Sequence, residues 1–170
     1  GRGKQATRAV RNRLGELLQS GATELTSHTS RVLVSQSDAT MHLPVHVGDY
    51  TDFYSSEDHA RNVGKMFRDP ENALLPNWKH MPVGYHGRAS SIVVSGTPIR
   101  RPHGQTRPDD AAPPVFGPSR LVDFELEMAF VTHGGKPLGE RITTEEADDF
   151  IFGLALFNDW SARDIQKWEY

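Results

Sequence analysis

Four carboxylate side chains stand next to ordered patterns in this sequence and are candidates for cation binding. Asp52 precedes a helical pattern, Glu125 and Glu127 alternate with apolar residues, and Asp159 follows an apolar run. Carboxylate oxygens are the ligands that hard divalent ions such as Ca²⁺ and Mg²⁺ prefer. Each acid could also be an ordinary solvated surface residue, so the spacing alone does not distinguish a surface acid from a cation ligand. Together the four acids make a cation site chemically plausible.

A histidine and a row of polar side chains could act beside such an ion. His59 falls in the first or second turn of a predicted helix, on one face with Val63 and Met66. Partial burial favours the neutral imidazole, which can accept a proton. The alternative is a packed histidine that hydrogen-bonds a backbone carbonyl.

Arg163, Gln166 and Tyr170 form a second polar row. Their spacing of i, i+3 and i+7 places them on one face of a predicted helix that begins near Ser161, directly after Asp159. A guanidinium, an amide and a phenol beside a carboxylate can hold a metal and an oxygen-rich substrate. A solvated amphipathic face fits the same pattern.

Two strands are predicted to position the acids. In residues 123–130 acidic or small side chains alternate with large apolar ones, which is a β-strand pattern. Asp123, Glu125 and Glu127 then share one face. The other face is predicted to enter a core, with Phe124, Leu126, Met128 and Phe130. Residues 151–157 are continuously apolar and are predicted to form a fully buried strand.

Capping signals predict the helices. Ser55 and Asp58 predict a helix over about residues 56–67, and Thr143 with Glu146 predicts a short one. In the first segment Thr7 is the candidate cap and Gly21 the stop.

The connecting segments are predicted from short apolar runs and from turn residues. Residues 31–36 and 91–95 are predicted strands. Residues 100–119 are rich in Pro, Gly, Asp and Arg and are predicted to be a long surface loop.

Composition narrows the classes of protein. In 170 residues with 36% hydrophobic content there is no apolar run of the roughly 20 residues that a membrane helix needs. No apolar signal core follows the first residues, so we expect neither a membrane-spanning nor a secreted protein. Without cysteine, any metal must be held by oxygen or imidazole, and a net charge of -3 gives no reason to expect nucleic acid. The lack of an initiator Met and a helical pattern that is unfinished at the last residue predict a fragment of a longer protein.

At these same residues the sequence resembles the fumarylacetoacetate hydrolase family. The resemblance runs along nearly the whole chain and is most specific in five segments: residues 48–56 (GDYTDFYSS), 75–78 (LPNW), 83–91 (VGYHGRASS), 125–127 (ELE) and 158–166 (NDWSARDIQ). The wider family shares the Glu-x-Glu and the later Asp. The segment Asp52-Phe-Tyr54 points to the members that cleave fumarylacetoacetate.

The resemblance implies a fold and a division of the chain. It implies an α+β, β-rich fold, the mixed β-roll of the family's C-terminal catalytic domain, here incomplete. Residues 1–40 would be an N-terminal helix and lead-in strand, and residues 41–170 part of a metal-dependent catalytic domain. It also implies a cytoplasmic enzyme, a homodimer in its full-length form.

The resemblance also implies roles for individual residues. Asp52, Glu125, Glu127 and Asp159 resemble metal ligands, with Ca²⁺ the expected ion and Mg²⁺ an alternative. His59 resembles the general base, and Arg163 with Gln166 the oxyanion-stabilising group. Substrate-contacting positions are matched by Tyr54, Arg68, Tyr85, Gln166 and Tyr170.

The implied reaction is hydrolysis of the carbon–carbon bond of 4-fumarylacetoacetate to fumarate and acetoacetate, the last step of tyrosine and phenylalanine catabolism. Two alternatives stay open: another metal-dependent member, acting on an acylpyruvate or as an oxaloacetate-type decarboxylase, or a non-catalytic fragment that binds calcium structurally. The family has a later carboxylate that orients the histidine and a lysine shortly after the position of Tyr170, and neither is in this sequence. We therefore expect at most weak activity, and marginal folding, from the isolated piece.

Overall fold

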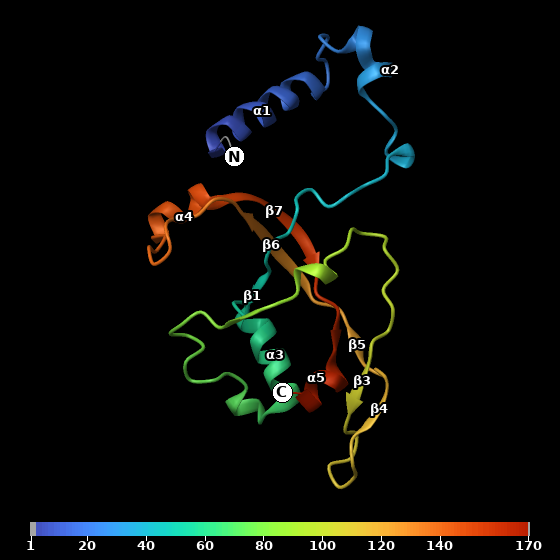
Figure 1. Cartoon of the computed structure of the whole chain (residues 1–170), viewed down its shortest axis with the longest axis vertical. Coiled ribbons are helices and arrows are strands. Elements are labelled where there is room, and N and C mark those ends of the chain that lie inside the picture. Colours follow the sequence, from blue (N-terminus) through green and yellow to red (C-terminus); the bar gives the residue numbers. More distant parts are fainter. Residues whose placement is uncertain (1–2, 170) are drawn as a thin grey trace. The chain divides into compact units, whose positions relative to one another are not determined.

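The computed structural model describes residues 3–169. It combines α-helices and short strands, and the strands pair as four two-stranded antiparallel sheets (Figure 1). The expected mixture of helices and strands is therefore confirmed, while the β-roll stays a prediction. None of the helices in this part of the chain is long and apolar enough to cross a membrane.

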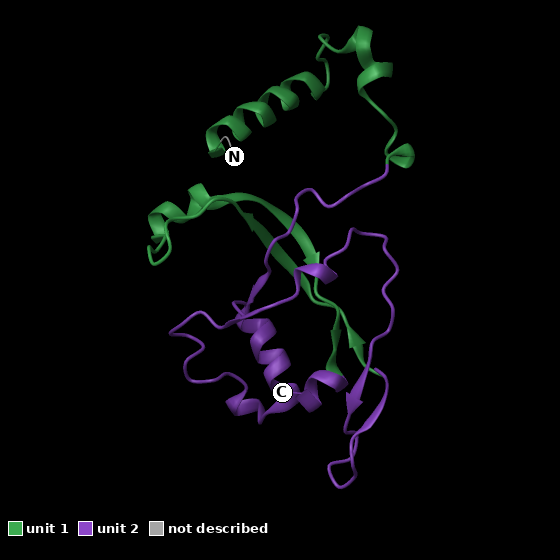
Figure 2. Ribbon diagram, in the orientation of Figure 1, with its two compact units in different colours: residues 1–39, 120–163 green, residues 40–119, 164–170 purple. Residues whose placement is uncertain are grey.

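The chain forms two compact units, coloured separately in Figure 2. Unit 1 combines residues 1–39 with 120–163, and unit 2 combines residues 40–119 with 164–170. Segments far apart in the sequence thus belong to one unit. The predicted division near residue 40 stays a prediction.

The first segment of unit 1 is helical. Helix α1 spans Gly3–Leu18, and Gly21 follows it with a φ of +88°, a conformation that favours glycine. Thr7 was predicted to cap this helix, which is wrong, because its hydroxyl donates to the carbonyl of Gly3 inside the first turn.

The predicted strand over residues 31–36 is also wrong. The 3-10 helix η1 (Thr26–His28) leads directly into the short helix α2 (Thr29–Val32), and η2 (Gln36–Asp38) follows. The hydroxyl of Thr29 donates to the carbonyls of Leu25 and Thr26, so these bonds lie within the helical turns and not between strands. No strand among residues 3–169 pairs with this segment.

The β6–β7 ribbon is the central element of unit 1. Strand β6 (Leu126–Thr132) pairs with β7 (Ile151–Asn158), with Glu127 opposite Phe157 and Phe130 opposite Leu154. Helix α4 (Thr144–Phe150) lies between them in sequence and begins with the predicted capping box of Thr143 and Glu146. Both strand predictions are confirmed, although the first strand is broken at Phe124 and Glu125.

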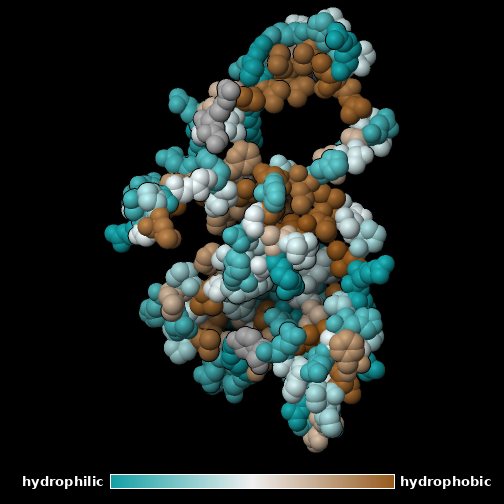
Figure 3. Space-filling view, viewed as in Figure 1, coloured by the Kyte–Doolittle hydropathy of each residue, from teal (hydrophilic) through white to brown (hydrophobic). Residues whose placement is uncertain are grey.

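The predicted burial of this ribbon is wrong. Its apolar face is exposed in this structure, and Figure 3 shows hydrophobic side chains gathered at the surface over β6 and β7. The exposed members are Leu126, Met128, Phe130, Phe152, Leu154 and Leu156. The opposite face, which carries Glu125, Glu127 and Asp159, is half-buried. The alternation correctly grouped the residues by face but did not indicate which face is covered.

A second short pairing ends unit 1. Strand β5 (Val122–Asp123) pairs with β8 (Ser161–Ala162), and helix α5 (Arg163–Glu169) follows at once. The helix was predicted to start near Ser161. It starts two residues later because Ser161 and Ala162 are held in the strand pair.

Unit 2 begins with a strand and a helix. Strand β1 (Thr51–Phe53) pairs with β2 (Gly84–His86), and helix α3 (Glu57–Phe67) follows β1. The 3-10 helix η3 (Pro70–Asn72) folds back on α3. Helix α3 confirms the prediction for residues 56–67. Its two buried residues, Ala60 and Gly64, are small, and Gly64 allows the backbone at Ala73, directly after η3, to approach the helix closely.

A hairpin replaces the predicted surface loop of residues 100–119. Strand β3 (His103–Thr106) pairs with β4 (Val115–Pro118). Gly104 makes room for Ile165 of helix α5, because a Cβ at this glycine would lie 2.8 Å from the Ile165 side chain. Ser119 is almost fully buried, and its hydroxyl donates to Asp164 at 2.5 Å. Strand pairing, rather than turn composition, decides this segment.

The predicted strand over residues 91–95 is wrong as well. The 3-10 helix η4 (Ala89–Ser91) occupies its start, and the chain then turns at Gly96, which has a φ of +87°. Three consecutive apolar residues do not form a strand here, and no partner strand lies beside them among residues 3–169.

Gly64 offers a stability test with a matched control. A Cβ at Gly64 would lie 2.2 Å from the carbonyl oxygen of Ala73, so Gly64→Ala should push α3 away from the η3 segment. We expect a loss of about 1–3 kcal/mol in the free energy of unfolding. Gly15→Ala in α1 meets nothing within 4 Å and should instead stabilise its helix by up to about 1 kcal/mol. Urea unfolding of the whole protein followed by circular dichroism measures both, and equal effects of the two substitutions would contradict the close approach.

Candidate metal and substrate site

The β6–β7 ladder places three of the four predicted metal ligands on one face of the ribbon. The N–H of Asp159 donates to the carbonyl of Glu125 at 3.0 Å, directly beyond the paired residues Leu126 and Asn158. Glu127 lies opposite Phe157, and Phe157 is two residues before Asp159 in the sequence. Because side chains alternate along a strand, Glu125, Glu127 and Asp159 share one face of the ribbon. All three are half-buried, so their charges are only partly hydrated.

The backbone of Glu125 is held at both ends. Its N–H donates to the side-chain oxygen of Asn158 at 3.1 Å, while its carbonyl accepts from Asp159. These bonds continue the connection between the two strands where the regular ladder ends. The position of Glu125 is therefore set by the backbone on both sides of its side chain.

Arg163 provides the positive charge at this end of the ribbon. Its side chain is 3% exposed, and its guanidinium contacts Asp123 through Nε at 3.1 Å and Glu125 through Nη2 at 2.5 Å. Burial lowers the pKa of the guanidinium, but hydrogen bonds and charges from Glu125 and Asp123 outweigh that effect and raise its pKa above the ordinary value. Arg163 therefore stays charged and is neutralised locally by two carboxylates.

Asp52, the fourth predicted ligand, lies in unit 2 on strand β1. Two phenol hydroxyls donate to its Oδ2 atom, from Tyr50 at 3.0 Å and from Tyr85 at 3.1 Å. Tyr85 stands directly opposite Asp52 in the β1–β2 pairing. Sequence reasoning missed Tyr50, although its place two residues before Asp52 put it on the same face of an extended chain.

His59 and Tyr54 lie against each other in unit 2. Their rings meet edge to face with centroids 5.5 Å apart, and the hydroxyl of Tyr54 donates to the carbonyl of Ala60 at 3.3 Å. His59 is half-buried, as expected, in the first turn of α3. The hydroxyl of Ser56 caps that turn by accepting from the N–H of His59 at 3.3 Å. The predicted cap, Ser55, was one residue early.

The remaining predicted substrate residues have different surroundings. Arg68 ends helix α3 and donates from Nη1 to the carbonyl of Ala73 at 3.1 Å. Gln166 is half-buried on helix α5, one turn after Arg163. Tyr170 lies outside the described residues.

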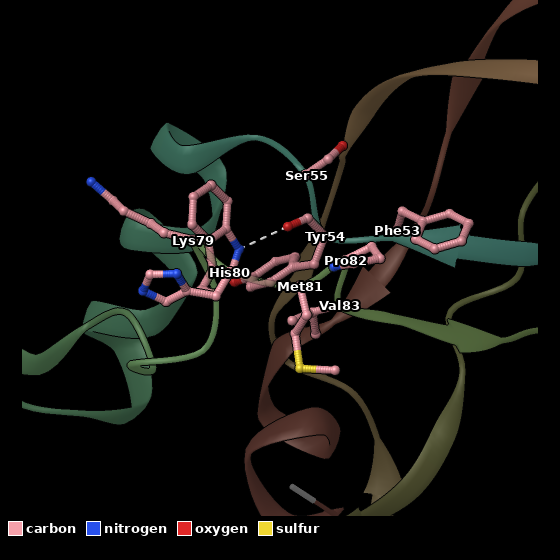
Figure 4. Close-up of a pocket in the computed structure, with 9 residues that line it drawn as sticks. Phe53, Tyr54, Ser55, Lys79, His80, Met81, Pro82 and Val83 are labelled. Atoms are coloured by element: carbon pink, nitrogen blue, oxygen red, sulfur yellow. Dashed lines mark hydrogen bonds between the residues drawn. The ribbon is translucent and has the colours of Figure 1, made fainter. Parts of the chain in front are cut away.

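A cavity of about 350 Å³ in unit 2 adjoins Tyr54 (Figure 4). It is lined by Phe53–Ser55 and by Trp78–Val83, and the indole N–H of Trp78 donates to the carbonyl of Tyr54 at 2.8 Å. Figure 4 shows Lys79 and His80 on one side of the cavity and Phe53 on the other. Of the predicted substrate residues that the structure describes, only Tyr54 is among its lining residues, so this hollow does not itself define the reacting centre.

The predicted site residues thus fall into two groups. Glu125, Glu127, Asp159 and Arg163 belong to unit 1; the second group, in unit 2, comprises Asp52, Tyr54, His59, Arg68, Tyr85 and Gln166. The first group offers oxygen ligands and a fixed cation. The second offers a carboxylate held by two phenols and a histidine beside a phenol. Carboxylate oxygens suit a hard cation, and a histidine suits a proton transfer.

Residues 49–170 match the family model described as fumarylacetoacetate (FAA) hydrolase C-terminal. The chain belongs to this family. The family's match covers most of unit 2 and the acid-bearing ribbon of unit 1, so the resemblance noted in the sequence is confirmed.

Relatives that are similar to this chain include several fumarylacetoacetases. The chain is 60% identical to the Homo sapiens protein, over 100% of this chain and 41% of that protein. It is 63% identical to the Caenorhabditis elegans protein over 95% of this chain, and 50% identical to the Arabidopsis thaliana protein over 99%. The chain spans about 40% of the length of the relatives that it matches.

The two serines before α3 allow a direct test of what positions His59. Ser56→Ala removes the cap and leaves the N–H of His59 without its acceptor, so we expect a loss of about 1 kcal/mol in the stability of α3. Ser55→Ala is the matched control and should change stability much less, since Ser56 holds the cap. Hydrogen exchange at the amides of α3 in the whole protein reports the difference, and a larger effect from Ser55→Ala would show that the cap is misassigned.

Proposed function

We propose that this chain is part of an enzyme that hydrolyses the carbon–carbon bond of 4-fumarylacetoacetate, giving fumarate and acetoacetate. The observation that carries the proposal is its 60% identity, over 100% of the chain, to the fumarylacetoacetase of Homo sapiens. The reaction would be the last step of tyrosine and phenylalanine catabolism. With the activity we propose a cytoplasmic location and a homodimeric whole protein.

We further propose that Asp52, Glu125, Glu127 and Asp159 hold one divalent cation. The donor set supports this, because four carboxylates offer only hard oxygen ligands and suit Ca²⁺ or Mg²⁺. The three acids of the ribbon share a half-buried face, where their mutual repulsion costs more than in water. Ca²⁺ is our first choice, since its flexible coordination tolerates a set of this kind more readily than the octahedral geometry of Mg²⁺.

The residues of the chain have distinct roles in the proposed reaction. A divalent cation bound here supplies Lewis-acid stabilisation of the negative charge that develops on the enolate leaving group. His59 takes a proton from the attacking water. The ring lies edge to face against Tyr54, and the Ser56 cap holds the backbone N–H of His59. Water adds to the carbonyl carbon, the carbon–carbon bond breaks, and the departing enolate takes up a proton to give acetoacetate.

The other polar residues would orient the substrate. Arg163 and Gln166 lie one helical turn apart on α5 and are proposed to donate to the oxyanion. Arg68, Tyr54, Tyr85 and Tyr170 are proposed to hold the carboxylate ends of the substrate. A planar guanidinium such as that of Arg68 matches a carboxylate with two parallel hydrogen bonds.

His59→Ala tests the separation of proton transfer from cation binding. In the whole protein we expect kcat to fall by about 10² to 10⁴-fold, because a general base contributes that much. The affinity for Ca²⁺ should stay within about twofold, since His59 is not a proposed ligand. His28→Ala, an exposed histidine of η1, is the control and should leave kcat unchanged. Full turnover by His59→Ala would contradict the assignment of the base.

Substrate selectivity tests the proposed reaction itself. The segment Asp52-Phe-Tyr54 is typical of the members that cleave fumarylacetoacetate, so we expect kcat/KM to be higher for fumarylacetoacetate than for an acylpyruvate or oxaloacetate. Parallel assays of the whole protein with Ca²⁺ or Mg²⁺ measure the ratio. A preference for an acylpyruvate would assign a different member of the family, and calcium binding without any hydrolysis would favour a structural cation site.

A further inference from the structure

The buried guanidinium of Arg163 is shared between two carboxylates that have different tasks. Glu125 is a proposed cation ligand, whereas Asp123 has no role in the proposed reaction. Yet Asp123 contacts the Nε atom and Glu125 the Nη2 atom of the same 3%-exposed side chain. A cation that has lost its water needs compensating charge and hydrogen bonds, and removal of either partner leaves it undercompensated.

Asp123 is fixed at both of its side-chain oxygens. Oδ1 accepts from the N–H of Phe124 at 3.0 Å, and Oδ2 accepts from Nε of Arg163. Its backbone pairs with Ser161 across β5 and β8, and the N–H of Arg163 donates to the carbonyl of Leu121 at 2.8 Å. The carboxylate and the backbone of Arg163 are therefore joined by the same short sheet. Asp123 can hold Nε at one position and so fix the rotation of the guanidinium.

That rotation decides how Arg163 meets Glu125. A guanidinium readily forms two parallel bonds with a single carboxylate and then occupies both of its oxygens. Here Nε is engaged by Asp123, and Nη2 contacts Oε1 of Glu125. The side chain of Glu125 is itself only 11% exposed, so it has little water to replace a misplaced partner.

We propose that Asp123 is a positioning residue for the cation site: by holding Nε of Arg163 it fixes the guanidinium, whose Nη2 contacts Oε1 of Glu125, and so keeps Glu125 in one orientation. The proposal rests on the proposed function, in which Glu125 is a cation ligand. Without Asp123, Arg163 turns toward Glu125 and pairs with it alone. The guanidinium then competes with the ion for the oxygens of Glu125 and neutralises the charge of this carboxylate. Residues that orient ligands in this way typically contribute about 10- to 100-fold to metal affinity.

Calorimetric titration of the whole protein with Ca²⁺ and with Mg²⁺, without substrate, tests this. Asp123→Asn keeps the shape but removes the charge, and we expect its dissociation constant for the ion to rise about tenfold or more. Arg163→Lys should weaken binding similarly, since a lysine cannot reproduce the two-carboxylate fork. Glu146→Gln is the matched control. Glu146 is also paired with a cation, Lys136, and is 42% exposed against 43% for Asp123, so we expect a change of less than twofold.

Each result has a distinct meaning. If the unsubstituted protein binds neither ion, the proposed cation site fails. If it binds an ion and Asp123→Asn binds equally well, the cation site stands and the positioning role is overturned. The melting temperature of each metal-free variant separates a loss of folding from a loss of affinity, because a purely structural role lowers the melting temperature without changing the affinity of the folded molecules. Should Asp123→Asn fail to fold, Arg163→Lys decides, and an unchanged affinity in that variant overturns the proposal.

Discussion

The antiparallel pairing of β6 with β7 is the constraint on which the acid-bearing part of the structure depends. Its register places Glu127 opposite Phe157, and the bond from Asp159 to the carbonyl of Glu125 extends the connection past the last pair. A shift of one residue would turn every side chain to the opposite face. The acids would then lie among the apolar residues of the ribbon, and the carboxylate face would be lost. The register is therefore as important for the chemistry as the identity of the acids.

Local signals in the sequence predicted several elements correctly. The capping box at Thr143 and the helix after Ser56 depend on contacts within four residues, and such contacts can be read from a short segment. The strand at residues 31–36 and the loop at residues 100–119 failed because pairing decides them. A strand needs a partner, and the β3–β4 hairpin is formed by two segments whose composition alone suggests turns.

Burial could not be predicted from alternation. The alternation correctly assigns Leu126, Met128 and Phe130 to one face, but these side chains are 72%, 61% and 52% exposed. Which face of a ribbon is covered depends on what packs against it, and that information is not in the ribbon itself. In the described part of the chain the buried hydrophobic residues are Ala60 and Ala73, both in unit 2, so α3 and its neighbours pack more closely than the ribbon does.

The candidate site was predictable in its residue types and not in its contacts. The acids and the histidine follow from the resemblance, because no spacing shows that residues as far apart in the sequence as Asp52 and Asp159 belong to one function. Asp123 looked like one more acid on a solvated face. Its partner Arg163 is 40 residues away in sequence, and only the β5–β8 pairing brings the two together. Arg163 in turn was read only as a donor to the substrate, whereas the structure gives it two carboxylate partners.

Charge balance in unit 1 supports the proposed cation site. Asp123, Glu125, Glu127 and Asp159 bring four negative charges to one end of the ribbon, and Arg163 compensates for only part of them. The backbone bonds at Glu125 and Asp159 fix the main chain at two of these residues, so that only rotation of the side chains can relieve the repulsion. A protein that holds like charges together pays for it in stability, and an ion that binds only the folded form returns that stability. Preorganised repulsion of this kind would distinguish the proposed cation site from an ordinary solvated acidic face, where the side chains separate freely into water.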